Sequence, residues 1–355
     1  MNKGLYLHIP FCHSICHYCD FTRCIYSEQL ANQYIDKLVR DIDQLDDDFI
    51  TCYIGGGTPS CLTTKQLTTL LKSLQRFNFK EFTIEANPND IDFELVKLLV
   101  SHKINRISLG VQSLDDQLLK DINRNHSVKQ VYQAIDILNS NGLNNISIDL
   151  IYGFKQQSLA LWEDTLIKSL NLDVQHLSIY ALTIEENSYF KRHNIESVDD
   201  DTSYLMYQKA VEILSSKFEH YEISNFAFNN HYSFHNMLYW KDDNYIALGL
   251  GASGKMNNIR KTYSTNFIDY LNDNAYEIEE NTIDEMKFEY IMTNLRLVKG
   301  LDINEYFNRF NSDIFLDYAV IKKLIDDNQL VYIDNYLKIR EDLLFVSNSI
   351  LVSFL

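Results

Sequence analysis

The sequence predicts an α/β protein, in which a partial (β/α)6 TIM-like barrel is followed by a small, mainly helical C-terminal module. Strand-like runs alternate six times with longer amphipathic runs in the first half, and the alternation does not continue cleanly past Leu182. From Thr282 onward, helical periodicity dominates. Alternating strands and helices are typical of a parallel sheet covered by helices. Because a closed barrel needs eight such units, we expect an open one.

The six strands are expected at 4–9, 50–56, 82–86, 106–111, 145–153 and 176–182. The helices between and after them are expected at 27–45, 64–75, 92–102, 114–122, 127–141 and 158–170. In these helical segments apolar residues recur at three- and four-residue intervals, as at Leu67, Leu70, Leu71 and Leu74. The carboxyl ends of parallel strands share one face, where sites usually form. We therefore expect the site on the loops that follow the strands.

Three regions are expected along the chain: a barrel core at 1–184, a connecting region at 185–280 and a C-terminal module at 281–355. The connecting region has a mixed pattern that is rich in Tyr and Asn. In the module, helical runs precede VYIDNYLKI, which predicts a short hairpin and hence a winged-helix-like arrangement. The apolar tail LLFVSNSILVSFL predicts a buried final helix.

Composition excludes several classes of protein. The formal net charge of -17 over 355 residues disfavours general binding to nucleic acid. No apolar stretch reaches the roughly 18 residues of a membrane span, and the N-terminus lacks the features of a secretory signal. Six cysteines in a chain of this length do not form a disulfide framework. We expect a cytoplasmic protein without a membrane anchor, whose clustered thiols bind metal or do redox work.

Three cysteines, Cys12, Cys16 and Cys19, stand close together in HIPFCHSICHYCDF with the spacing C-x3-C-x2-C. Thiolates suit iron–sulfur clusters, zinc and copper(I). A zinc site would need a fourth ligand, for which Cys24, His13 and His17 are candidates. Three thiolates on a [4Fe–4S] cube would leave one iron open to a small molecule. The spacing favours the open cluster, and zinc stays the alternative.

The stretch YLHIPFCHSICHYCDF resembles the radical S-adenosylmethionine (SAM) superfamily, in its coproporphyrinogen-oxidase-like branch. The resemblance implies that the three cysteines hold three irons of a [4Fe–4S] cluster. The amino and carboxylate groups of SAM would then chelate the fourth iron, and an electron from the reduced cluster could cleave SAM. The cluster and SAM would carry the difficult chemistry, and the protein would position them and exclude water.

The resemblance continues through IGGGTPS, IEANP, SLGVQSLDDQLLKDINRNHS and SIDLIYGF. It implies that the glycine-rich segment contacts the methionine moiety and that Arg124 binds the SAM carboxylate. Strand-end polar groups would bind SAM hydroxyl or amino groups, one tyrosine would pack near adenine, and Tyr6 would lie beside the cluster. The implied SAM residues are Tyr6, Tyr18, Gly57, Thr58, Glu85, Gln112, Arg124 and Asp149. Lys155 departs from the pattern, because the branch usually has a proline there, and this puts the shape of its loop in doubt.

Within the branch, the sequence favours HemW-type heme chaperones over oxygen-independent coproporphyrinogen III oxidase. Phe21 stands where the oxidase has a further cysteine, and Cys12 comes too early for the oxidase's N-terminal segment. HNMLYW resembles the proposed heme segment HN-x-x-YW, which implies His235 as the axial ligand with Tyr239 and Trp240 stacked on the porphyrin. Without the resemblance, His235 would be read as a core histidine among aromatic neighbours.

The function expected is therefore that of a heme chaperone that delivers heme to acceptor proteins, with respiratory enzymes as candidate acceptors. Its expected cofactors are a [4Fe–4S] cluster, an exchangeable SAM and heme. Two alternatives stay open: SAM-dependent oxidation of a porphyrinogen, and a cluster-bearing scaffold that docks on another protein without binding heme. The sequence identifies neither the acceptor nor the oligomeric state.

Overall fold

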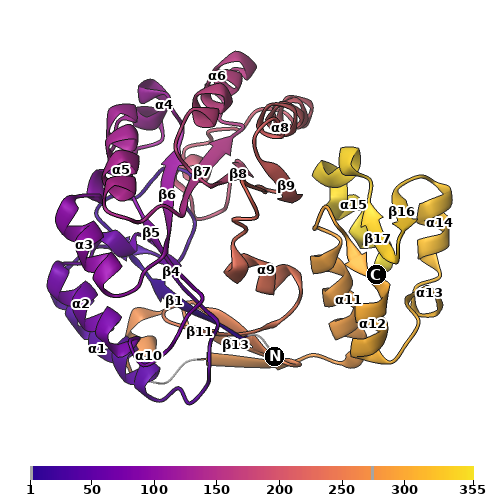
Figure 1. Ribbon diagram of the computed structural model, residues 1–355, viewed down its shortest axis with the longest axis horizontal. Coiled ribbons are helices and arrows are strands. Elements are labelled where there is room, and N and C mark those ends of the chain that lie inside the picture. The colour runs from indigo at the N-terminus through magenta and orange to yellow at the C-terminus, as the bar shows by residue number, and fades with distance from the viewer. Residues whose placement is uncertain (1–2, 273–275) are drawn as a thin grey trace.

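The computed structural model describes residues 3–272 and 276–355, and its main feature is a twelve-stranded sheet ordered β14-β13-β12-β11-β1-β4-β5-β6-β7-β8-β10-β9 (Figure 1). The central strands are parallel and comprise β11 (Asn244–Leu248), β1 (Lys3–Ile9), β4 (Thr51–Gly56), β5 (Glu81–Ala86), β6 (Arg106–Gln112), β7 (Ile146–Tyr152) and β8 (His176–Ala181). The six predicted strands are confirmed, each to within one residue at either end. The partial barrel is therefore the observed fold.

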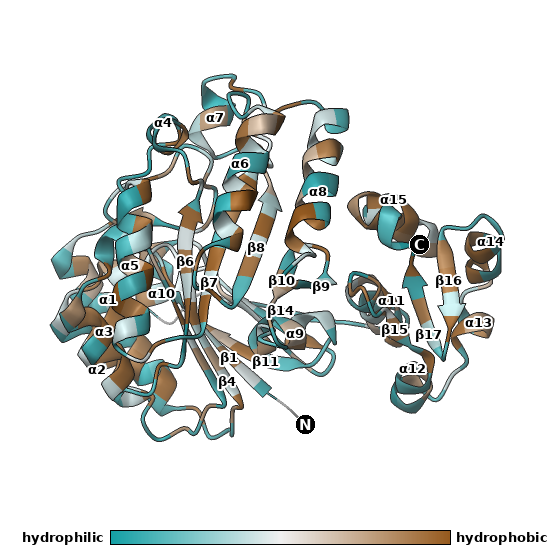
Figure 2. Cartoon of the chain, turned by 45° about the horizontal axis from the view of Figure 1, so that its top comes forward, coloured by the Kyte–Doolittle hydropathy of each residue, from teal (hydrophilic) through white to brown (hydrophobic). Residues whose placement is uncertain are grey.

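Six helices follow these strands and cover the outside of the curved sheet (Figure 1). They are α1 (Glu28–Asp43), α2 (Thr64–Ser73), α3 (Phe93–Ser101), α4 (Asp116–Asp121), α5 (Val128–Ser140) and α6 (Leu159–Leu170). Capping boxes at Thr63 and Ser127 explain where α2 and α5 begin, because each side chain accepts a hydrogen bond from a backbone N–H of the first turn. Hydrophobic and polar residues alternate along these helices, as expected for helices that bury one side only (Figure 2).

The two faces of the parallel sheet differ in polarity because successive side chains on a strand point to opposite faces. Leu5, Leu7 and Ile9 of β1 are fully buried in the hydrophobic core together with apolar residues of the helices. The alternate residues Tyr6 and His8 are hydrogen-bonded to each other. On neighbouring strands the same alternation gives polar pairs such as Tyr53 with Glu85 and Ser108 with Asp149. The inner face of the barrel is thus polar and leads toward the carboxyl ends of the strands.

The segment expected as a connecting region contributes strands to both edges of the sheet. Its elements are α7 (Tyr189–Arg192), α8 (Asp200–Leu214), β9 (Glu219–Glu222), β10 (Asn225–Ala227), α9 (Phe234–Trp240), β11, β12 (Ser253–Met256), β13 (Ile259–Tyr263), α10 (Phe267–Leu271) and β14 (Tyr276–Glu280). β10 pairs antiparallel with β8, whereas β11 pairs parallel with β1 at the other side. One hydrophobic cluster includes residues from Leu5 to Tyr270. The division at residue 184 stays a prediction.

The C-terminal part has a hydrophobic cluster of its own, which extends from Tyr290 to Phe354. Its elements are α11 (Ile283–Asn294), β15 (Leu301–Asp302), α12 (Ile303–Phe310), α13 (Ile314–Asp317), α14 (Val320–Asp326), β16 (Leu330–Ile333), β17 (Tyr336–Ile339), the 3-10 helix η3 (Glu341–Val346), α15 (Ser347–Leu351) and η4 (Val352–Phe354). The predicted hairpin is confirmed as β16–β17, with Asp334 and Asn335 at positive φ in its turn. The predicted final helix is short, and its apolar side chains are buried.

Figure 1 shows this C-terminal part beside the barrel, next to α9 and β9. None of the helices within residues 3–272 and 276–355 combines the length and apolar character needed to cross a bilayer.

Candidate functional site

The cysteine loop occupies the carboxyl end of β1, between the short strands β2 (Phe11–Cys12) and β3 (Cys24–Ile25), which pair in parallel. The backbone N–H of Cys24 donates to the carbonyl of Pro10 at 2.7 Å, and that of Tyr26 donates to the carbonyl of Cys12 at 2.9 Å. In the middle of the loop, the N–H of His17 donates to the carbonyl of Ile122 at 3.1 Å. These bonds fix the loop at both ends and in its centre.

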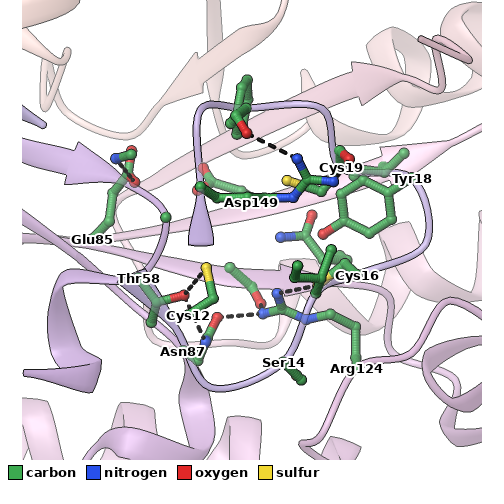
Figure 3. A pocket seen from close by; sticks show the side chains of 18 of the residues that line it. Cys12, Ser14, Cys16, Tyr18, Cys19, Thr58, Glu85, Asn87, Arg124 and Asp149 are labelled. Atoms are coloured by element: carbon green, nitrogen blue, oxygen red, sulfur yellow. Dashed lines mark hydrogen bonds between the residues drawn. The ribbon is translucent and has the colours of Figure 1, made fainter. Parts of the chain in front are cut away.

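The thiols of Cys12, Cys16 and Cys19 line one cavity of about 370 Å³ (Figure 3), a volume within the usual range for small-molecule sites. The Thr58 hydroxyl donates to the sulfur of Cys12 at 3.5 Å, and an Arg124 N–H donates to the sulfur of Cys16 at 3.3 Å. Burial raises the pKa of the Cys12 thiol and raises that of Cys19 to about 11. Binding of iron would therefore displace protons from these thiols.

The donor set of this cavity fits a [4Fe–4S] cluster. A zinc site draws its ligands around one ion, whereas a [4Fe–4S] cube distributes its thiolates over separate irons. Among the residues that the structure describes, no three His, Cys, Asp or Glu side chains converge as they would on one ion. Of the candidate fourth ligands, His13 lines the cavity and Cys24 and His17 do not. Cys12, Cys16 and Cys19 are the residues that would hold the cluster.

The glycine-rich segment packs against the cysteine loop so closely that a side chain would not fit. A Cβ atom at Gly57 would lie 2.8 Å from the carbonyl oxygen of Phe11 and 3.0 Å from the sulfur of Cys12. The backbone N–H of Gly57 donates to the carbonyl of Ile9 at 2.8 Å, and that of Thr58 donates to Phe11 at 2.8 Å. Gly57 and Thr58 both line the cavity. The segment continues into the 3-10 helix η1 (Pro59–Cys61).

Two carboxyl groups, those of Glu85 of β5 and Asp149 of β7, face the cavity (Figure 3). Glu85 accepts hydrogen bonds from the Tyr53 hydroxyl at 2.8 Å and from the backbone N–H of Gly56 at 3.0 Å. Asp149 accepts from the Ser108 hydroxyl at 3.1 and 3.2 Å. Burial raises the pKa of both carboxyls, and that of Glu85 rises to about 7 with the charge of Asp149 as the next cause. Buried acids of this kind in a cavity are typical of a ligand site.

The raised pKa of Glu85 predicts a pH-dependent stability in the cluster-free chain. Between its ordinary pKa of 4.5 and about 7, the folded chain holds the Glu85 proton and the unfolded chain does not. The free energy of unfolding should therefore fall as the pH rises through this window, by roughly 3 kcal/mol from this residue. Urea unfolding at a series of pH values should show a shallower decline for Glu85→Gln. Equal pH slopes in both proteins would contradict the assignment.

The side chains of Gln112 and Arg124 both lie next to Gly110, at the end of β6. Gln112 has a φ of 66° where the register between β6 and β7 shifts. A positive φ is unfavourable for a residue with a side chain, so this bulge is a strained position of the kind that occurs at functional sites. A Cβ atom at Gly110 would lie 3.0 Å from Arg124 Nη2 and 3.0 Å from Gln112 Nε2. Both predicted side chains line the cavity.

Asn87 is a site residue that the sequence did not single out. Its side-chain oxygen accepts from Arg124 Nη2 at 2.6 Å, and its Nδ2 donates to the Thr58 hydroxyl at 3.3 Å (Figure 3). Asn87 therefore links the arginine to the residue that contacts Cys12. It precedes the 3-10 helix η2 (Pro88–Asp90), and the strand-end position of EANPND was the signal that could have found it. Arg23, which donates to the carbonyls of Cys19 and Phe21, was missed as well.

Tyr18 and Tyr6 differ in their positions. Tyr18 lines the cavity, and its ring packs edge-on against Phe154 at 6.0 Å. Tyr6, expected beside the cluster, does not line the cavity; its hydroxyl is hydrogen-bonded to Nδ1 of His8 at 3.0 Å.

Lys155 lies outside the cavity, with its Nζ 3.6 Å from a Glu196 carboxylate oxygen. Lys155 is therefore not part of the cavity lining.

The HNMLYW segment forms α9, which packs on the strands and not at the cavity. His235 is fully buried, and both ring nitrogens are hydrogen-bonded, Nδ1 with the Thr51 hydroxyl at 2.8 Å and Nε2 with the Tyr239 hydroxyl at 2.7 Å. Burial lowers the pKa of His235 to about 3. The indole nitrogen of Trp240 is buried without a hydrogen-bond partner. For His235 to bind iron, one of its hydrogen bonds would have to break and α9 would have to move.

Replacing His235 by alanine should lower the free energy of unfolding by about 2–4 kcal/mol. The change would leave a cavity and two buried hydroxyls, those of Thr51 and Tyr239, without their partner. Denaturant unfolding would measure the loss. The exposed His193 provides the matched control, because its replacement by alanine should cost less than about 1 kcal/mol. Equal stabilities of the His235 and His193 variants would show that His235 is not a core residue.

Sequence comparisons show which known proteins this chain resembles. The sequence profile of the radical SAM superfamily matches residues 6–167. The heme chaperone HemW of Lactococcus lactis is 38% identical over 268 residues, which cover 73% of this chain and 71% of that protein. The heme chaperone HemW of Bacillus subtilis is 31% identical over 355 residues, with 93% of each chain covered. This chain belongs to the HemW family.

The HemW family shares its fold with a radical SAM enzyme of known structure. Coproporphyrinogen III oxidase (HemN) from Escherichia coli superposes with a TM-score of 0.87 and covers 99% of this chain and 90% of its own. Its sequence identity is 20%, so the similarity concerns the fold. The heme chaperone HemW of Escherichia coli is 31% identical over 314 residues, with 84% of this chain covered.

Proposed function

We propose that this chain is a heme chaperone, which binds heme and delivers it to acceptor proteins. The observation that carries the proposal is the similarity to proteins named heme chaperone HemW, which reaches 31% identity over 93% of both chains in the relative from Bacillus subtilis. Respiratory enzymes are the candidate acceptors. The net charge of -17 disfavours nucleic acid as a partner. We infer a cytoplasmic location.

Three thiols would hold a [4Fe–4S] cluster, with an exchangeable SAM beside it in the same cavity. Arg124 and Asn87 offer hydrogen-bond donors for a carboxylate, while Glu85 and Asp149 offer acceptors for amino or hydroxyl groups. Arg124 also has a buried Nε without a hydrogen-bond partner. When bound, the cluster and SAM would supply one-electron chemistry. The chain's own residues would orient the two groups and shield them from water.

SAM-dependent porphyrinogen oxidation is the second candidate, because Glu85, Gln112, Arg124 and Asp149, which the resemblance implies for SAM, line the cavity. Phe21 argues against it. This residue stands where the oxidase has a further cysteine, and its side chain is 70% exposed at the rim of the cavity. A cluster-bearing scaffold that binds no heme is the third candidate.

A paired assay on the anaerobically reconstituted chain tests the proposal. In the first arm, heme-loaded protein is freed of excess heme and mixed with the apo form of a heme protein, and the transfer of heme is followed by absorption. In the second arm, coproporphyrinogen III, SAM and a reductant are added, and decarboxylated product is measured. We expect transfer without decarboxylation. Decarboxylation would support the oxidase. If neither activity is observed, the scaffold is the remaining candidate.

A further inference from the structure

A heme ligand must offer a ring nitrogen that no protein group already occupies. The inference below rests on the proposed function, namely that this chain binds heme. In His235 both nitrogens are hydrogen-bonded to hydroxyl groups. The same is true of His8, which bonds Tyr6 and the carbonyl of Thr22, and of the buried His176. The fourth buried histidine, His126, has an unpaired Nδ1, but this nitrogen is itself buried and out of reach of a porphyrin. The exposed histidines are therefore the better place to look for an iron ligand.

We propose that heme binds on a stack of three rings, His17, Tyr189 and His193, with Nε2 of His193 as the iron ligand. The centroids of His17 and Tyr189 are 4.0 Å apart at an interplanar angle of 18°, and those of Tyr189 and His193 are 3.7 Å apart at 20°. The tyrosine is therefore held between two imidazoles. Such a stack fixes the orientation of its histidines without burying them.

Hydrogen bonds to the backbone determine which nitrogen of each histidine is free. Nδ1 of His193 lies 2.9 Å from the carbonyl oxygen of Tyr189, and Nδ1 of His17 lies 3.0 Å from that of Asp121. A carbonyl oxygen can only accept, so Nδ1 carries the hydrogen and Nε2 keeps its lone pair. Metal-binding histidines usually donate their other N–H in this way. The exposed His193 thus presents a pre-oriented ligand nitrogen.

The stack lies beside the cysteine loop. His17 stands between Cys16 and Tyr18, and the backbone N–H of Phe190 donates to the carbonyl of His17 at 3.1 Å, which fastens α7 to the loop. Figure 2 shows α7 at the end of the barrel toward which the parallel strands run, whereas α9 lies at the other end. Heme on His193 would therefore be close to the cluster cavity, and heme on His235 would not.

The charge around His193 suits the two carboxylates of heme. Lys191 and Arg192 precede it on the last turn of α7, and both side chains are exposed. Lys191 pairs with Glu186 at 2.9 Å, and Arg192 donates to the carbonyls of Ser188 and Asn187. In a chain with a net charge of -17, two adjacent cations next to a free imidazole are a suitable place for an anionic porphyrin. A surface site with one ligand also suits a carrier, because release would not require the core to open.

Heme titration of the anaerobically reconstituted full chain tests the inference. His193→Ala should weaken heme binding by roughly tenfold or more, and added imidazole should restore the heme spectrum. His231 is the matched control, because it is only half-buried and its Nδ1 lies 2.8 Å from the carbonyl of Phe228; His231→Ala should bind as the wild type does. The double variant Lys191→Glu, Arg192→Glu should bind heme more weakly and bind its dimethyl ester as the wild type does.

The outcomes separate this inference from the proposed function. If the wild type binds no heme, the proposed function itself fails. If the wild type and His193→Ala bind heme equally, the chaperone proposal stands and the site on the stack is wrong. Loss of binding only in His235→Ala, with circular dichroism unchanged, would assign the heme to α9. Loss only in His102→Ala would assign it to the small cavity lined by Phe77, Phe79 and Phe82, and would equally overturn the inference.

Discussion

Replacing Cys12, Cys16 or Cys19 by alanine is expected to abolish cluster assembly. Each thiol would bind one iron of the cube, and none of the other three cysteines lines the cavity to substitute for it. Iron and inorganic sulfide bound per chain, measured after anaerobic reconstitution, should fall close to background in each variant. The effect should be nearly complete, because two thiolates do not hold the cube firmly enough to keep it in an aqueous cavity.

The matched controls are Cys24→Ala and Cys52→Ala. Cys24 belongs to β3 and Cys52 to β4, and both lie outside the cavity. Both variants should bind iron and sulfide as the wild type does. If Cys24→Ala lost as much metal as the three cavity variants, Cys24 would be a ligand, and the zinc alternative would regain support.

The second large effect concerns a buried ionic network between the barrel and the C-terminal part. Asp242, which follows α9, accepts charge-assisted hydrogen bonds from Lys255 of β12 and from Arg309 of α12, the latter at 2.9 Å. Lys255 also pairs with Glu289 of α11 at 2.9 Å. The side chains of Asp242 and Lys255 are only 2% and 3% exposed. Burial removes the hydration of both charges, and each charge compensates for the loss in the other.

Asp242→Ala is expected to lower the free energy of unfolding by about 3 kcal/mol, the lower end of the range for breaking a buried pair, because Lys255 would keep Glu289 as a partner. Urea unfolding would measure the change. Asp164→Ala is the control, since the Asp164–Lys168 pair at 2.5 Å is 50% and 42% exposed and should contribute less than about 1 kcal/mol. Similar losses in both variants would show that the Asp242 network does not join the two parts.

The alternation of strands and helices was sufficient to predict the barrel, because each unit is local in sequence. β11 was not predicted, and the reason is physical. It is only five residues long and pairs in parallel with β1, about 240 residues earlier in the chain. Strand pairing at such a separation leaves little trace in local periodicity, and the short apolar run of β11 gives no helix or strand signature of its own.

The candidate site was predictable where a motif fixes a residue next to a strand end. Gly57, Glu85 and Gln112 follow that rule, whereas Asp149 lies in the middle of β7, and all four line the cavity. The heme segment was harder to place, since the sequence HNMLYW is compatible with an exposed histidine that binds heme and with a histidine buried in the core. Only the packing of α9 on β1 distinguishes them: a Cβ atom at Gly4 would lie 2.7 Å from Leu238 and 3.1 Å from the ring of His235.

The most direct test of the central claim is an equilibrium titration of heme into the anaerobically reconstituted full-length chain, with iron and inorganic sulfide counted in the same sample. The account predicts saturation at one heme per chain in protein that also carries the iron and sulfide of a [4Fe–4S] cluster. Heme absorption that rises without saturating, in protein that has its full cluster, would contradict the assignment of this chain as a heme chaperone.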